Sequence, residues 1–129
     1  MRMTYRAGHR IAAAEFAVQH KPDRVFITDG DKPVATYVFR DDKILRPYFT
    51  NVHAPGGIQV TRNHPPVPNV DATDHDTMHP GVWLAFGDLS GQDFWRNKAR
   101  IVHVRFVEPP AVRDGQVTFT AENAFQAAK

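Results

Sequence analysis

Turn-forming residues divide this sequence into short apolar runs from Glu15 onward. Groups of Asp, Gly and Pro recur at intervals of about 8–12 residues, a spacing typical of β-sandwiches and β-barrels. Within runs such as "QVTFT" at residues 116–120, apolar and polar side chains alternate. The ten prolines and eight glycines favour many turns over long helices. We therefore predict an all-β fold, an antiparallel β-sandwich in which residues 1–129 form a single domain.

The runs between the turns define the expected strands. We predict strands at residues 14–19, 24–28, 33–40, 44–52, 58–62, 82–88, 99–108 and 116–123. The turn signal Asp29-Gly30-Asp31 joins two of these runs into a hairpin. Pro47 removes a backbone donor from its run, which places that point at a sheet edge or a bulge. For the tail at residues 124–129 we expect a frayed helical turn or no regular structure.

The alternation also predicts which side chains face the core. In residues 116–123, Val117 and Phe119 point inward, and Thr118 and Thr120 point outward. In residues 99–108, the apolar set is Val102, Val104 and Phe106, and the set on the opposite face is His103 and Arg105.

Composition excludes several classes of protein. An apolar fraction of 42% with 23% charged residues is that of a soluble globular chain. No apolar run approaches the roughly 20 residues needed to span a bilayer, so we expect no membrane association. The apolar run Ile11–Ala14 is too short for a signal peptide, which makes the cytoplasm the expected location. Cysteine is absent, and the net charge of +2 comes from scattered basic residues, so we expect neither disulfides nor a nucleic-acid partner.

The segment at residues 63–81 breaks the strand pattern. It contains four prolines before Gly81 and no usable period. Loops longer than about 12–15 residues inside a compact domain are usually functional or disordered. The polar residues that gather within its sixteen positions from 64 to 79 are His64, Asp71, Asp74, His75, Asp76 and His79.

These histidines and aspartates have three interpretations. Histidine exchanges protons near neutral pH, and neutral imidazole is also a common metal ligand. The spacing of His75 and His79 puts both rings on one face if the segment is helical, although Pro80 disfavours a regular helix. Loop histidines flanked by aspartates are most often hydrogen-bond partners that hold the loop. We therefore keep loop ordering, proton transfer and metal binding as alternatives.

Aromatic and basic residues nearby have similar alternatives. Trp83 lies in a predicted strand and is expected in the core, whereas Trp95 could stack on a sugar or another flat ligand. Arg46 and Tyr48 share one face, where a guanidinium could receive a carboxylate or a hydroxyl-rich ligand. A solvated or salt-bridged Arg46 is the simpler expectation. In "GDLSGQDFW", Asp88 and nearby turn residues are expected to bond backbone donors in a structured connection.

Three stretches in order carry a resemblance to a known family. They are "LRPYFTNVHAPGGIQVTRNHPP", "DHDTMHPGVWLAFGDLSGQDFW" and "RIVHVRF". This combination resembles the bacterial family catalogued as methane oxygenase PmoA-like, also carried as a domain of unknown function. The similarity runs from about residue 25 to residue 107. Many relatives have His-His-Arg-Gly before the strand, whereas this chain reads Met78-His79-Pro80-Gly81.

The resemblance implies a fold more than a reaction. It implies a β-rich domain similar to the supersandwich of galactose mutarotases, of which this chain would be a half or a truncated version with an open sheet edge that favours self-association. It does not imply methane oxidation, because a membrane subunit would need several spanning helices. The polar cluster that the resemblance implies is His64, Asp74, His75, His79, Asp88, Asp93 and Trp95.

The leading hypothesis is a carbohydrate-related enzyme or binder. In it, His75 or His79 exchanges a proton with a sugar, Asp74 orients the imidazole, and Trp95 or Tyr48 stacks on the sugar ring. The remaining ligand-binding candidates are Arg46, His64, Asp88 and Asp93. One alternative is a non-catalytic sugar-binding or assembly module. Another is a metal-dependent enzyme that uses the histidines and a carboxylate, although we assign no metal ligand and no cofactor.

Overall fold

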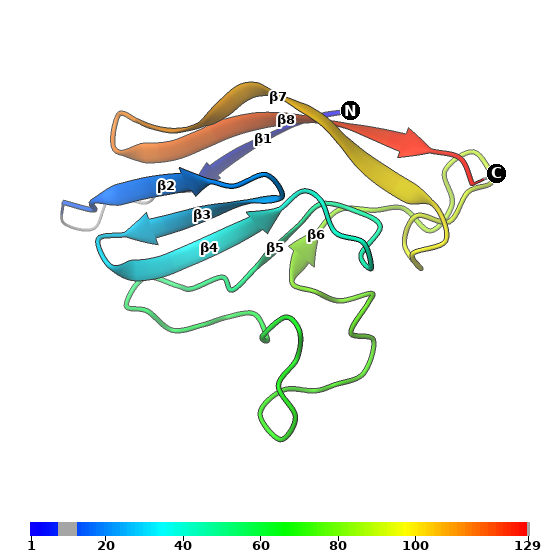
Figure 1. The fold of residues 1–129 in the computed structure, drawn as a ribbon, viewed down its shortest axis with the longest axis horizontal. Coiled ribbons are helices and arrows are strands. Elements are labelled where there is room, and N and C mark those ends of the chain that lie inside the picture. Colours follow the sequence, from blue (N-terminus) through cyan, green and yellow to red (C-terminus); the bar gives the residue numbers. More distant parts are fainter. Residues whose placement is uncertain (8–12, 129) are drawn as a thin grey trace.

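The computed structural model describes residues 1–7 and 13–128, and within them eight strands form two antiparallel sheets. The strands are β1 (Arg2–Ala7), β2 (Phe16–His20), β3 (Arg24–Asp29), β4 (Lys32–Val38), β5 (Tyr48–Thr50), β6 (Val82–Trp83), β7 (Arg100–Arg113) and β8 (Gln116–Gln126). One sheet has the order β1-β8-β7 and the other has the order β2-β3-β4-β5-β6. Figure 1 shows the three-stranded sheet lying over the five-stranded sheet. The predicted all-β antiparallel sandwich is confirmed.

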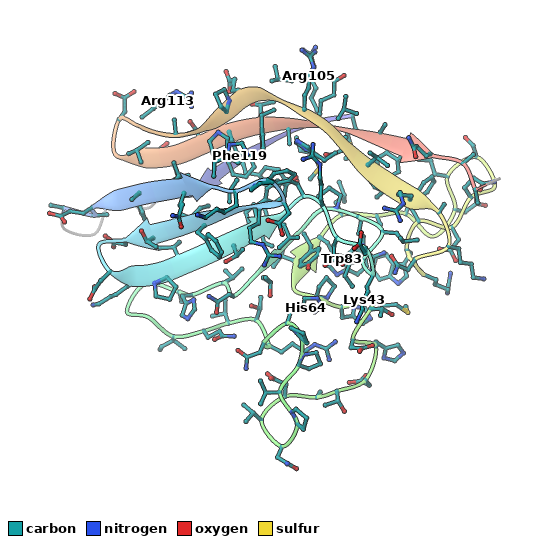
Figure 2. All side chains as sticks on the ribbon, in the orientation of Figure 1. Lys43, His64, Trp83, Arg105, Arg113 and Phe119 are labelled. Carbon is teal, nitrogen blue, oxygen red and sulfur yellow. The ribbon has the colours of Figure 1, made fainter. Side chains whose placement is uncertain are left out.

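The main core lies between the two sheets. Its buried members are Val25, Ile27, Tyr37, Phe39, Val117 and Phe119. They come from the inward positions of β3, β4 and β8 and from the residue that follows β4, and Phe119 is labelled between the sheets in Figure 2. The prediction that Val117 and Phe119 point inward is confirmed, since each side chain is only 1% exposed.

The opposite face of the five-stranded sheet is buried as well. Val38, Ile44 and Tyr48 form a second apolar cluster there, with Trp83 packed against it. The long connection from β5 to β6 extends beyond this side of the sheet, drawn in green in Figure 1. A sheet covered on both faces explains why nearly continuous apolar runs, and not only alternating ones, form β4 and its neighbours.

The hairpin predicted around Asp29-Gly30-Asp31 is confirmed. β3 and β4 pair through it, and Gly30 has φ +59°. Several other predicted strands are shorter than expected: residues 44–52 contribute only Tyr48–Thr50, and residues 82–88 contribute only Val82–Trp83. β6 is an edge strand with one partner, so little of it is held in the ladder.

The strand predicted at residues 58–62 is wrong. This segment makes a single isolated bridge, between Gln59 and His53, and has no sheet neighbour. Ile58 and Val60 are 69% and 61% exposed, because no second layer covers them. Apolar side chains alternate here, but they are not buried against anything.

The face assignment in the seventh strand is also wrong. His103 is buried at 7% exposure, whereas Val104 is 51% exposed. The pairing of β7 with β8 shifts between His103 and Arg105, so Val104 sits in a bulge and the alternation changes phase. Beyond this point Phe106 faces the core as predicted, packed against the main cluster.

Both ends of the chain contain more strand than expected. β1 was not predicted, yet it pairs with β8 along its whole length, and Tyr5 packs on Tyr37 and Phe119. β8 continues to Gln126 through the expected frayed tail, because β7 supplies partners as far as Arg100. The strand expected from residue 14 begins at Phe16. Within the described residues, no helix is long and apolar enough to cross a membrane.

Candidate functional site

Most of the predicted site residues lie on the outer-face side of the five-stranded sheet. Some belong to the connection from β5 to β6, and others lie next to β5 or follow β6. Figure 2 labels His64 and Trp83 on this side, with Arg105 on the far side of the three-stranded sheet. In the sheet register Tyr48 lies opposite Trp83, which places both side chains on the outer face. We call this region the outer-face site.

Arg46 is the buried centre of the site. Its side chain is 3% exposed, and its guanidinium carbon lies 3.8 Å from the centre of the Trp83 ring. The guanidinium donates hydrogen bonds to the carbonyl oxygens of Phe94, Trp95 and Met78. Burial lowers the pKa of Arg46 to about 10, which still leaves it protonated at neutral pH. The expectation of a solvated or salt-bridged Arg46 is wrong, because this cation is buried and its two terminal nitrogens donate to main-chain carbonyls.

Tyr48 and His64 lie beside Arg46 in a second polar group. The Tyr48 hydroxyl donates to Oδ2 of Asp41 at 2.6 Å, and the His64 ring meets the Tyr48 ring edge-on with centroids 5.4 Å apart. Burial acts to raise the pKa of Asp41, but hydrogen bonds from Tyr48 and two backbone amides outweigh it and lower that pKa. Burial also lowers the pKa of His64, whose buried Nδ1 has no hydrogen-bond partner in the described residues. His64 is therefore a neutral ring against a neutral phenol.

Arg62 holds in place residues 72–79 of the connection from β5 to β6, which we call the histidine loop. Its guanidinium donates to the carbonyl oxygens of Ala72, Asp74, His75 and His79. A planar group with five donors can hold several carbonyls at once, which a lysine cannot do in the same way. The loop is thus fixed by two arginines, Arg62 on one side and Arg46 through Met78 on the other.

The two loop histidines come together in one hydrogen-bonded turn, in which His75 has φ +49°. The amides of Met78 and His79 both donate to the carbonyl oxygen of His75. His75 Nδ1 lies 2.8 Å from Oδ2 of Asp74, and this hydrogen bond is the main reason that the pKa of Asp74 is lowered. Asp74 is therefore placed where it could orient the His75 imidazole, and its catalytic role stays a prediction. The ring centroids of His75 and His79 lie 5.6 Å apart.

Four aromatic rings form a continuous row across the site. The centroid distances are 5.6 Å from His75 to His79, 5.8 Å from His79 to Trp83, and 4.6 Å from Trp83 to Trp95. Trp83 is half-buried and packs against two apolar clusters, as expected for a core residue. Trp95 is 42% exposed at the end of the row. We call these four residues the aromatic row.

Asp88 and Asp93 shape turns beside the site. Asp88 accepts a hydrogen bond from the amide of Gly91, which has φ +76°, as expected for a structured connection. Asp93 accepts from the amide of Arg96 and pairs with its guanidinium. Asp93 is close enough to Arg46 to raise its pKa slightly against the effect of burial. Asp93 thus has both oxygens engaged locally, and Asp88 has one.

Three residues of the site were not singled out in the sequence. Asp41 holds Tyr48, Arg62 holds the histidine loop, and Asp71 accepts bonds from the amides of Asn63 and Val67 and from the Asn63 side chain. Asp71 was counted only as a member of the polar loop.

Among the described residues, no three or more His, Asp and Glu side chains are placed to hold one metal ion, so the geometry gives the metal hypothesis no support.

Replacing Arg62 with alanine is expected to release the histidine loop without unfolding the sandwich. Four carbonyl oxygens lose their donor, but they lie at the surface, where water can replace it. Hydrogen–deuterium exchange should show the amides of Met78 and His79 exchanging at least tenfold faster, with β7 and β8 unchanged. Arg96→Ala removes another exposed arginine outside the loop and serves as control. Unchanged exchange at residues 78 and 79 would contradict this role for Arg62.

Acidification is expected to lower the free energy of unfolding through His64. Its pKa in the folded state lies below the value of about 6.5 in the unfolded chain. The unfolded state therefore binds the proton first, and stability falls as the pH drops from about 6.5 through the lowered folded pKa. Urea unfolding at pH 7.5 and 5.5 measures the loss, which should be smaller in His64→Asn. His103, whose pKa burial also lowers, contributes to the remaining slope. An identical slope in the variant would exclude His64 as a source.

Comparison with known proteins places the chain in a family. A family model described as a family of unknown function, DUF6807, matches residues 24–129. The chain belongs to this family. The match begins at the first residue of β3 and includes every residue of the outer-face site, so the DUF6807 region contains the aromatic row and both arginines that support it. No curated protein and no solved structure matches the chain. The resemblance to the PmoA-like family stays a prediction.

Proposed function

We propose that the chain binds a carbohydrate at the aromatic row. The observation that carries the proposal is the continuous contact from His75 through His79 and Trp83 to the exposed Trp95. Aromatic faces beside polar groups suit the apolar C–H faces and the hydroxyls of a sugar. Exposure of the row lets a ligand reach it from solvent.

The row is built on a rigid support. Arg46 stacks on Trp83 and bonds the carbonyl oxygen of Trp95, so both tryptophans are fixed through one buried side chain. Arg62 fixes the loop that carries His75 and His79. A surface that is already ordered loses little conformational entropy when a ligand binds. These supports favour recognition by a preformed face.

The Asp74–His75 pair adds a group suited to proton transfer. The carboxylate accepts from Nδ1–H, which leaves Nε2 of a neutral ring free to take a proton from a sugar hydroxyl. This pair supports the second candidate function, an enzyme acting on the bound sugar. His79 is near enough to His75 to contact the same ligand.

A cytoplasmic location and self-association through an open sheet edge remain predictions alongside this proposal.

Isothermal titration of the purified chain with a panel of mono- and disaccharides tests the binding proposal. We expect saturable heat with at least one saccharide and at least a tenfold loss of affinity in Trp95→Ala, because stacking on an exposed aromatic ring is removed. Leu89→Ala is the matched control, since Leu89 lies with Trp95 in the connection from β6 to β7, is 40% exposed and does not belong to the aromatic row. No heat from any saccharide, or equal binding by Trp95→Ala, would refute the proposal.

His75→Ala separates binding from chemistry. Wild-type protein incubated with a bound reducing sugar is followed by proton NMR for exchange or epimerisation at the sugar carbons. Activity that disappears in His75→Ala while affinity falls less than threefold identifies an enzyme. Binding without any turnover in the wild type identifies a non-catalytic module.

A further inference from the structure

A cavity of about 270 Å³ lies at one end of the sandwich, apart from the aromatic row. One wall comes from residues 39–46, which follow β4, and the other from residues 100–103 at the start of β7. The amide of Ile101 donates to the carbonyl oxygen of Leu45, which ties the two walls together. In Figure 1 these segments meet where the yellow start of β7 passes the cyan turn after β4. We call this space the end cavity.

Two buried nitrogens in the lining have unused hydrogen-bonding capacity. They are Nδ1 of His103 and Nε of Arg46, which have no hydrogen-bond partner among the described residues. The two residues are 7% and 3% exposed. Buried polar atoms are normally satisfied, and an unsatisfied one beside a cavity indicates a missing partner. The Nε–H of Arg46 is a donor, and a neutral imidazole can donate through Nδ1.

The charges around the end cavity favour an anion. Three arginines and two aspartates line it. Asp41 is already engaged, with one oxygen accepting from Tyr48 and the other from the amides of Lys43 and Ile44. Arg100 is exposed and makes no hydrogen bond or ion pair with any residue that the structure describes. Burial is the main cause of the lowered pKa of His103; the neighbouring Asn123 side chain acts to raise this pKa, and the nearby positive charge of Arg40 adds to the lowering.

The rest of the wall is apolar. Phe39, Ile44 and Ile101 line the end cavity and are at most 5% exposed. Apolar walls with a few polar groups are the usual composition of sites for small organic molecules, and this volume is at the small end of that class. The lining thus offers an apolar surface and donors for one acceptor group.

We propose that the end cavity binds a small organic acid, whose carboxylate accepts hydrogen bonds from His103 and Arg46 and whose apolar part packs on Phe39, Ile44 and Ile101. Arg100 adds positive charge at the mouth. Charge-assisted hydrogen bonds to a carboxylate are stronger than neutral ones, which favours the acid over a neutral analogue. The end cavity shares Arg46 and Asp41 with the outer-face site but contains no residue of the aromatic row, so organic acids and saccharides test the two proposals separately.

NMR titration of the whole chain tests the end cavity with three probes at constant ionic strength: butyrate, its neutral analogue butyramide, and inorganic phosphate. We expect butyrate to shift the amide signals of residues 101–103 and the ring nitrogens of His103 in a saturable way. Butyramide and phosphate should each bind at least tenfold more weakly, because the first lacks the charge and the second lacks the apolar part. Equal binding of either probe, or no shift at residues 101–103, would overturn the proposal.

Arg100→Gln tests the charge at the mouth. This exposed residue can be changed without disturbing the core, and butyrate affinity should fall about tenfold, equivalent to a loss of about 1.4 kcal/mol. Arg105→Gln is the control, because Arg105 is paired with Glu122 away from the end cavity. Unchanged affinity in Arg100→Gln, or the same loss in both variants, would contradict the assigned role.

Discussion

Gly81→Ala is expected to destabilise the protein by about 4 kcal/mol. Gly81 has φ +154°, and a Cβ at this position would lie 1.9 Å from the carbonyl oxygen of Phe49. The clash is with the backbone of β5, which cannot move without breaking its pairing with β4. Because Gly81 leads directly into β6, the displacement would also reach Trp83.

Urea unfolding followed by far-ultraviolet circular dichroism measures the effect of Gly81→Ala. The matched control is Gly87→Ala, where the nearest atom to the new Cβ is the Arg96 Nη1 at 3.9 Å and φ is not in the left-handed region. The control should change stability by less than about 1 kcal/mol. Equal stability of the two variants would mean that the close packing of Gly81 on β5 is not required.

Arg46→Met is expected to cost about 3–5 kcal/mol of stability. The substitution keeps much of the side-chain volume but leaves the carbonyl oxygens of Phe94, Trp95 and Met78 without their donor. It also removes the guanidinium that lies over the Trp83 ring. The tryptophan fluorescence of the folded variant should change, because Arg46 lies over the Trp83 ring and donates to the carbonyl oxygen of Trp95.

Two further variants define the role of Arg46. Arg46→Lys keeps the charge but not the planar donor set. It should therefore be less stable than the wild type but more stable than Arg46→Met. Arg105→Met removes an exposed arginine paired with Glu122 and should cost no more than about 1 kcal/mol. A methionine variant as stable as the wild type would show that apolar packing alone supports this region.

The fold could be predicted from the sequence where local signals agree. The hairpin at Asp29-Gly30-Asp31 and the inward pair Val117 and Phe119 follow from turn chemistry and alternation. The strand at residues 58–62 was predicted on the same signal and does not form, because burial depends on a neighbouring layer that local sequence does not specify. The buried His103 follows from a bulge that alternation cannot reveal.

Most residues of the candidate site could be predicted from the sequence, but the contacts that hold them in place could not. The stretch from Asp74 to Trp95 contains the residues of the aromatic row, and their residue types alone drew attention to them. The roles of Arg46 and Arg62 depend on carbonyl oxygens that are all ten or more residues away in the sequence. Backbone acceptors have no signature in a sequence, so an arginine that organises loops looks the same as a solvated one.

If the aromatic row is a carbohydrate-binding face, as we propose, a bound sugar must change the indole N–H signals of the protein in an NMR spectrum. The chain has two tryptophans, both in the row, so each contributes one indole N–H signal, assigned with Trp95→Phe. We predict that a saccharide from the panel shifts the Trp95 signal saturably, with a smaller shift for Trp83. Indole signals that stay unchanged at saturating concentrations of every saccharide would contradict the claim.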